Sequence, residues 1–469
     1  MPAQLALLLT TVFVLFLFWR DVKERPPVTG ALWVPLLWML ILGSRGASGW
    51  LGWGGTYATP DGLAEGSPLD AATFGALEVA GLLILVRRNV SLPAVLSRNP
   101  WLGIYLGYCA LAILWSDFPF VAFKRWLKVL AQPIMVLIVA TEPDVPEALR
   151  RLMKRAAYVL VPFSILLIKY YPTLGRSYDG WTGAASYTGV TTNKNLLGAD
   201  CLVLGFFFCW HFLTTRRGPR GHARREELML SAAFLCMIAW LLWKANSATS
   251  LMALVVGMAT VLLLGRNFID REKVGVYLVT ALVIYSGAEL VLGVTATLIR
   301  ALGRDSTLTG RTDIWAAVLQ ADINPLLGAG FESFWLGDRA ERFWAMFQFR
   351  PNQAHNGYLE TYLNLGWIGV TLMVGWILSA FRRAGRTFSS DFDLGRFQLG
   401  MLASIAVYNL TEAGFRGLNL IWFAFYLVAL NHWHARKAPD HVAVSRSVAQ
   451  PNLATRIGVP ASFARNRYR

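Results

Sequence analysis

Residues 3–19 read AQLALLLTTVFVLFLFW, an apolar run long enough to cross the roughly 30 Å hydrocarbon core of a bilayer as a helix. The composition agrees, because 55% of the residues are hydrophobic and only 15% are charged, against about 25% in an average soluble domain. The sequence therefore predicts an all-α, polytopic transmembrane helical bundle of about 12–13 spans. We expect the further spans near residues 31–48, 71–86, 101–115, 120–140, 156–170, 195–213, 227–244, 250–265, 274–298, 357–381, 397–414 and 419–433.

The topology of such a bundle explains most of the net charge of +16. Basic residues concentrate in alternate connections and in the tail after residue 433, which together hold 29 of the 44 Lys and Arg. The positive-inside rule assigns these segments to the cytoplasm, so no nucleic-acid partner is needed and the N-terminus is expected outside. The connections are 20–25, 87–98, 150–155, 216–225, 266–273 and 382–396.

One long polar segment, residues 299–356, interrupts the spans, and we call it the island. It is expected on the outer side, and its Arg, Asp and aromatic residues make it the first place to look for recognition or chemistry. The chain then divides into spans at 1–298, the island at 299–356, spans at 357–433 and a basic, disordered tail at 434–469.

Fifteen basic residues lie on the predicted outer side, where topology does not require them. Lys124, Arg125 and Lys128 are the clearest group, because they lie in or near a span and only Asp117 is close in sequence as a partner. A charge deep in a span costs at least about 2.5 kcal/mol and normally faces protein or a wet cavity. These cations predict an anion-binding site, and phosphate is the natural ligand. Snorkelling of single side chains to the interface is the alternative.

A second basic region contains Arg176 and Lys194. Residues 189–195 read GVTTNKN and lead into the span near 195–213. Free backbone N–H groups at the start of that helix, together with Lys194, would favour an anion there. A plain helix N-cap at Thr192 or Asn193 also accounts for the pattern.

His355 closes the island and is the only one of the six histidines placed on the outer side. If chemistry there needs a base near neutral pH, His355 is the leading candidate. Asn356, Glu360 and Asn364 form a polar stripe on the following helix, which should therefore face protein or water, and Glu360 or Tyr358 would orient the imidazole. The plainer alternative makes His355 a surface residue and the polar neighbours helix caps.

Glu412 and Arg416 lie near the outer end of a late span, four residues apart and in the order that favours a helical ion pair. A structural salt bridge and a role in a site fit this spacing equally well. The four cysteines all lie inside predicted spans and form neither a disulfide framework nor a CxxC pattern. No metal site and no cofactor are predicted.

The order of several motifs resembles the O-antigen ligase and polymerase superfamily, and within it the bacterial exopolysaccharide polymerases most. The motifs are NKN at 193–195, SATSL at 247–251, TGRTDIW at 309–315, NPLLGAG at 324–330 and HNGYLE at 355–360. The resemblance covers roughly 120–420, and the spacing from GRTxxW to HNxxLE is its most specific part. It implies a GT-C-like, metal-independent glycosyltransferase of the bacterial inner membrane, which takes its glycan from an undecaprenyl diphosphate carrier on the periplasmic side.

By the same resemblance, Arg311 corresponds to a loop arginine that engages the diphosphate, and His355 to an essential histidine. Ser247 is followed by Ala248 where many ligases of the superfamily carry an arginine, so a two-arginine ligase mechanism does not transfer directly, and Lys244, Lys194 and Arg125 are the candidates to supply that charge. We therefore expect His355, Arg311 and Glu360 to be catalytic, and the diphosphate to be bound by Lys124, Arg125, Lys128, Lys194, Arg176 and Arg416.

The working hypothesis is a polymerase that joins lipid-linked repeat units into exopolysaccharide, with a lipid-linked oligosaccharide, an acceptor glycan and the bilayer as its partners. A chain-length regulator and export proteins would be further partners. A ligase that moves the glycan to lipid A core is the nearest alternative. A transporter of polysaccharide or lipid-linked sugar is the alternative of another class, and would carry charged sites near the midplane. The aromatic residues of the island suit either stacking on sugars or packing of the loop against the bundle.

Overall fold

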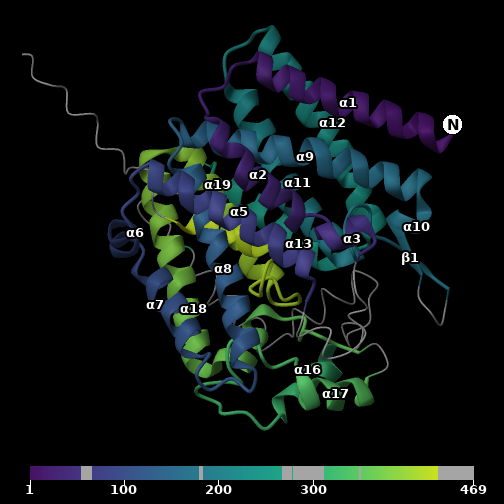
Figure 1. The fold of residues 1–469 in the computed structure, drawn as a ribbon. Helices are drawn as coiled ribbons and strands as arrows, with labels where there is room; N and C mark the ends of the chain where they lie inside the picture. Colours follow the sequence, from purple (N-terminus) through teal and green to yellow (C-terminus); the bar gives the residue numbers. More distant parts are fainter. Residues whose placement is uncertain (54–65, 179–182, 267–276, 278–310, 348–349, 431–469) are drawn as a thin grey trace, which may run out of the picture. The chain divides into compact units, whose positions relative to one another are not determined.

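The computed structural model describes residues 1–53, 66–178, 183–266, 277, 311–347 and 350–430 (Figure 1). Within these residues the chain is almost wholly helical and contains one two-stranded antiparallel sheet. Apart from Tyr277, the expected span near 274–298 and the tail from 434 lie outside the described residues. The elements are α1 (Ala3–Lys23), η1 (Gly30–Leu32), α2 (Trp33–Leu42), α3 (Ala47–Leu51), α5 (Pro68–Arg87), α6 (Leu92–Arg98), α7 (Pro100–Leu111), α8 (Pro119–Ala140), α9 (Val145–Tyr170), α10 (Pro172–Gly175), β1 (Arg176–Tyr178), β2 (Ala185–Tyr187), α11 (Lys194–Arg217), α12 (His222–Ala245), α13 (Ala248–Leu263), α16 (Arg311–Leu319), α17 (Gly337–Met346), α18 (Gly357–Ser390), α19 (Phe392–Tyr408) and α20 (Leu420–Ala429).

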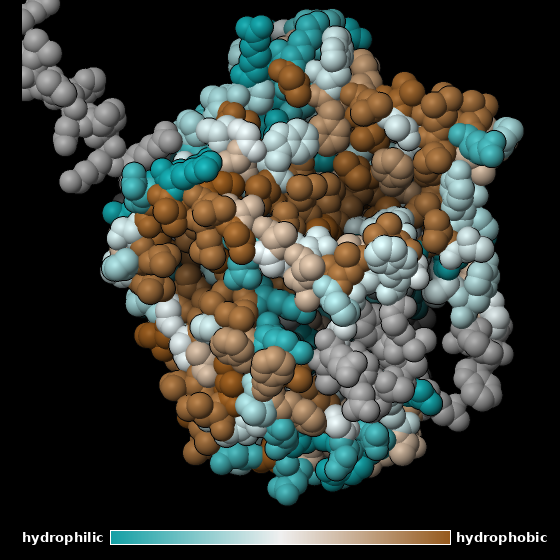
Figure 2. Space-filling model, viewed as in Figure 1, coloured by the Kyte–Doolittle hydropathy of each residue, from teal (hydrophilic) through white to brown (hydrophobic). Residues whose placement is uncertain are grey.

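The predicted all-α, polytopic membrane fold is confirmed. Among the described helices, α1, α5, α11, α12 and α18 are long and apolar enough to cross a membrane, and η1 with α2, α13 and α20 form shorter apolar helices. α1 and α5 leave most of their apolar side chains exposed, as lipid-facing helices do, whereas every residue of α20 is buried. Figure 2 shows apolar side chains over α1 and over α7 and α18, and hydrophilic ones around α16 and α17.

The interior is closed by helices that approach at small residues. Gly257 of α13 faces Gly400 of α19 so closely that a Cβ on Gly257 would lie 2.8 Å from the Gly400 carbonyl oxygen. Small side chains permit such close packing where lipid removes the hydrophobic drive between helices. The contact also aligns the start of α13 with the turn after α19, and both belong to the site described below.

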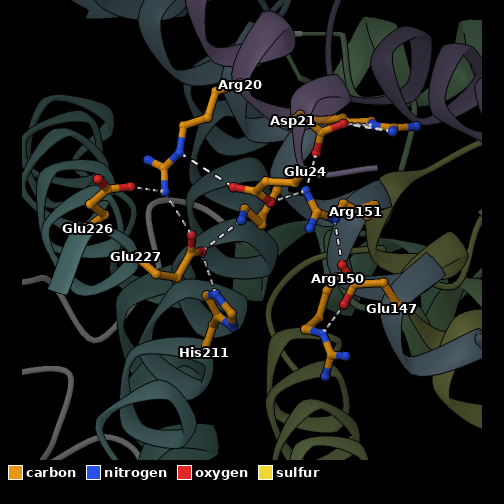
Figure 3. A network of polar contacts seen from close by, with 11 residues as sticks. Arg20, Asp21, Glu24, Glu147, Arg150, Arg151, His211, Glu226 and Glu227 are labelled. Atoms are coloured by element: carbon orange, nitrogen blue, oxygen red, sulfur yellow. Dashed lines mark hydrogen bonds and ion pairs between the residues drawn. The ribbon is translucent and has the colours of Figure 1, made fainter. Parts of the chain in front are cut away.

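Ion pairs join the basic connections at one end of the bundle (Figure 3). Arg151 of α9 binds Asp21 of α1 at 2.8 Å, and the Asp21 side chain has no exposed surface. Lys154 of α9 binds Glu227 of α12 at 2.7 Å. Basic segments that topology assigned to one side of the membrane therefore meet in the structure. Breaking a buried pair of this kind costs about 3–5 kcal/mol, so these residues also hold α1 and α12 against α9.

The helix that follows the island is broken at Gly366, which has a φ of +62°. In a bilayer the backbone groups freed by such a break need partners within the protein. Residues 325–330 supply them: Trp367 and Ile368 donate their N–H groups to the carbonyls of residues 325 and 326, and the carbonyls of residues 363 and 364 accept from residues 329 and 330.

This segment corrects the picture of the island as a loop kept in water. Residues 329–336 enter the protein, and Phe334, Trp335 and Ser333 are at most 3% exposed. Gly328 is needed there because a Cβ would lie 2.4 Å from the carbonyl carbon of Asn364. We call residues 324–336 the plug, and its NPLLGAG part supplies the backbone partners of the broken α18.

Gly366→Ala should destabilise the purified protein by at least about 2 kcal/mol, because it adds a clash to a left-handed backbone. The new Cβ would lie 2.2 Å from the carbonyl group of Leu326. Gly385→Ala is the matched control on the same helix, since nothing lies within 4 Å of its Cβ position. The thermal unfolding midpoint in detergent measures both, and equal midpoints would contradict the plug.

Candidate active site

A cavity of about 260 Å³ opens where several helix ends meet. It brings together three residues expected from sequence, Lys194, Arg311 and His355, although they are far apart along the chain. It also contains Glu412, for which the sequence allowed either a structural salt bridge or a role in a site. The lining residues are Lys194, Asn195, Asn246, Ser247, Ala248, Thr249, Arg311, Ile314, His355 and Glu412.

Glu412 is the centre of the polar contacts in this cavity. One carboxylate oxygen accepts from Arg311 Nη2 at 2.5 Å, and the other lies 3.1 Å from His355 Nδ1. The Glu412 side chain is only 5% exposed, so water screens these contacts poorly. A carboxylate accepts but does not donate, so it places a proton on Nδ1 and leaves Nε2 as the second ring nitrogen for chemistry.

The backbone before α18 holds His355 in a left-handed conformation, with a φ of +49°. Ala354 on one side donates its N–H to Glu360 at 2.8 Å and accepts from Trp315 Nε1 at 2.7 Å. Gly357 on the other side donates its N–H to the carbonyl of Asn409. A histidine in this conformation costs free energy that its neighbours have to offset, and such strain is typical of functional positions.

Arg311 is held by the turn that follows α19. Its Nη1 donates to the carbonyl of Thr411, and Nη2 binds Glu412. Thr411 Oγ1 in turn lies 2.8 Å from Thr249 Oγ1 at the start of α13. The guanidinium at the start of α16 is therefore tied to the turn after α19, and through Thr411 to the start of α13.

Helices α11 and α13 both begin at the cavity and add their partial positive charge to it. Asn193 caps α11 by accepting from the N–H groups of residues 195 and 196, which agrees with the capping alternative for this segment. Ser247 caps α13. Helix N-termini favour anions, and Lys194 and Arg311 against Glu412 leave one positive charge in excess. The cavity suits an anionic group, and Lys194 lines it together with Ala248, the residue that stands at the position of the missing arginine.

Glu360 was expected to be catalytic, but it is not among the described lining residues of the cavity. It is 2% exposed and accepts from Trp335 Nε1 at 2.9 Å as well as from Ala354. Arg416 lies 3.7 Å from Glu360 and donates to the carbonyl of Asn352. The carboxylate on the imidazole is thus Glu412 rather than Glu360, and Arg416 pairs with Glu360 rather than with Glu412.

The cations of α8 were expected at the same anion, but the cavity has no lining residue from α8 in the described chain. Arg125 donates to the carbonyl of Glu332, and this contact ties α8 to the plug of α18. Lys124 lies 4.9 Å from the Phe120 ring, and Lys128 is half-buried on the same helix. The plug occupies the space into which Arg125 points, which sequence spacing could not reveal.

Arg176, also expected at the diphosphate, is held in the β1–β2 hairpin. It donates from Nε and Nη2 to the carbonyl of Ile168 at 3.0 and 2.8 Å. Its guanidinium carbon lies 5.5 Å from the Tyr187 ring centroid.

Most of the described aromatic residues of the island pack against protein. Phe331, Phe334, Trp335 and Phe343 are buried. The indole nitrogens of Trp315 and Trp344 donate to backbone carbonyls. Phe349 lies outside the described residues. These contacts agree with the packing alternative.

Comparison with known proteins shows what this membrane protein is similar to. Residues 230–374 match the family model of the O-antigen ligases, a range that includes Arg311 and His355. Over 312 residues the chain is 28% identical to the exopolysaccharide production protein ExoQ of Rhizobium meliloti strain 1021, which covers 62% of this chain and 67% of that protein. Over these ranges the chain is similar to the O-antigen ligases and to a protein of exopolysaccharide production.

Glu360→Ala should loosen the backbone that presents His355. Loss of a buried hydrogen-bond acceptor costs about 1–3 kcal/mol, so amide exchange in a peptide spanning 351–357 should accelerate roughly tenfold or more. Hydrogen exchange followed by mass spectrometry measures this. Glu341→Ala, at an exposed position on α17, is the control, and equal exchange in both variants would refute the role of Glu360.

Proposed function

We propose that this protein is an inner-membrane glycosyltransferase that polymerises undecaprenyl-diphosphate-linked repeat units into exopolysaccharide on the periplasmic side. One observation carries the proposal: a single cavity joins a cationic site at two helix N-termini to an imidazole whose Nδ1 is held by a buried carboxylate. The first suits a diphosphate leaving group, and the second suits a general base.

In the proposed reaction, His355 Nε2 takes the proton from a hydroxyl of the acceptor sugar. The hydroxyl oxygen attacks the anomeric carbon of the donor, and the bond from that carbon to the diphosphate oxygen breaks with inversion. Undecaprenyl diphosphate leaves with the bonding electron pair. Glu412 stabilises the imidazolium that forms, and a positioned base of this kind contributes about 10² to 10⁴ in rate.

Arg311 and Lys194 would stabilise the negative charge that develops on the departing diphosphate, a task that fixed cations perform well in a site shielded from water. Arg311 shares Glu412 with His355 before the donor binds. A diphosphate that engages Arg311 competes with that ion pair and leaves more of the carboxylate's charge for the imidazole. Donor binding would thus strengthen the base.

The family description favours a second candidate, a ligase that transfers the glycan to another lipid acceptor. Both reactions use the same base and the same leaving group. They differ in product, which is a longer carrier-linked glycan for the polymerase and a glycan on the new acceptor for the ligase.

His355→Ala should abolish product from defined lipid-linked repeat units, by at least about 10²-fold, because it removes the base. Purified protein is incubated with the repeat units and the products are separated by size. His222→Ala is the control, since that side chain is 88% exposed on α12 at the other end of the bundle. Substantial polymer from His355→Ala would contradict the assignment of the base. In a parallel reaction of the unchanged protein with lipid A core added, glycan on that acceptor in place of polymer would establish the ligase.

Chelation should leave the reaction intact, because we assign the charge on the diphosphate to Arg311 and Lys194. The same assay is run with and without excess EDTA, and equal initial rates are expected. Loss of activity in EDTA that returns on addition of magnesium would refute a metal-independent mechanism.

A further inference from the structure

A second cavity, of about 340 Å³, adjoins the first. The two cavities share Lys194 and Asn246. We call the second one the hairpin cavity, because strand β2 forms one wall and the end of α12 the other. Its lining includes Ser186, Tyr187, Lys194, Trp243, Lys244 and Asn246.

The hairpin cavity combines cations with aromatic faces. Lys244 Nζ lies 4.2 Å from the Trp243 ring centroid and 4.9 Å from that of Tyr187. Arg176 approaches the same Tyr187 ring at 5.5 Å, so two cations hold this ring in place. Trp243 is 68% exposed, which leaves its surface available to a ligand.

The positive charge of this cavity is not neutralised by its walls. Of the described residues that line it, two are lysines and none is acidic. Neither Lys194 nor Lys244 forms an ion pair with any described residue. Aromatic rings offer a cation only a weak partner compared with a carboxylate. A ligand with a negative charge and an apolar face would pair with the lysines and pack on the aromatic rings.

We propose that the hairpin cavity is a subsite for an acidic sugar of the glycan, next to the sugar that reacts in the first cavity. The carboxylate of the sugar binds Lys244, and the C–H face of its ring packs on Tyr187 or Trp243. Lys194, at the boundary of the two cavities, stays with the diphosphate. Asn246 and Ser186 supply hydrogen bonds to sugar hydroxyls. This inference rests on the proposed glycosyltransferase function and names the chemistry of its substrate.

The test is binding of defined probes to the full-length protein in detergent, by isothermal titration calorimetry. The probes are trigalacturonate, the neutral trisaccharide maltotriose and inorganic pyrophosphate. Trigalacturonate should bind, maltotriose should bind at least tenfold more weakly, and Lys244→Gln and Tyr187→Ala should each weaken trigalacturonate at least tenfold. Lys23→Gln is the matched control, because Lys23 also lies over an indole ring, that of Trp19, but at the far end of α1.

Three outcomes would overturn the subsite: equal affinity for the acidic and neutral trisaccharides, no effect of Lys244→Gln on trigalacturonate, or an effect of that variant on pyrophosphate alone. The last outcome would assign the cavity to a phosphate group instead. His355→Ala separates this inference from the proposed reaction, because it should abolish product and leave trigalacturonate binding unchanged.

Discussion

The arrangement of this protein depends on one constraint of the bilayer: a broken helix must find partners for its free backbone groups inside the protein. α18 breaks at Gly366, and residues 325–330 of the island close the break. The plug that results is anchored to α8 through Arg125 and to the first turns of α18 through Asn364. It therefore fastens the middle of the segment between Arg311 and His355 to α8 and α18.

Within that frame, the carboxylate of Glu412 connects helices that share no local sequence. It reaches Arg311 on α16 and His355 before α18 from the turn after α19. Glu412 is buried, so each of these contacts is stronger than it would be at the surface. One acidic residue thereby sets the distance between the cation proposed for the leaving group and the base proposed for the acceptor. Close packing of α13 on α19 at Gly257 and Gly400 keeps that turn in place.

Local patterns predicted part of the site well. Asn193 and Asn356 stand before apolar helices, and both are N-caps, because capping is decided by side chains within three residues. The polar stripe of Glu360 and Asn364 does face protein, since lipid tolerates neither. The pairing of Glu412 with Arg416 failed, because the chain turns after α19 and their helical spacing does not exist there. Lys194 and Lys244 carried no local sign that they border neighbouring cavities.

The sequence by itself determined that the chain is a polytopic helical membrane protein, because hydrophobic length and the placement of basic residues act locally and independently of how the helices pack. It also determined the motifs that carry Arg311 and His355. Only the tertiary structure decided which residues meet. It places Glu412 on His355 and Lys194 at the same cavity, and it places Arg125 on the plug rather than at the expected anion. Those pairings depend on buried contacts between segments up to about two hundred residues apart. Packing and the need of buried polar groups for hydrogen-bond partners determine each of them, and a local sequence pattern contains neither.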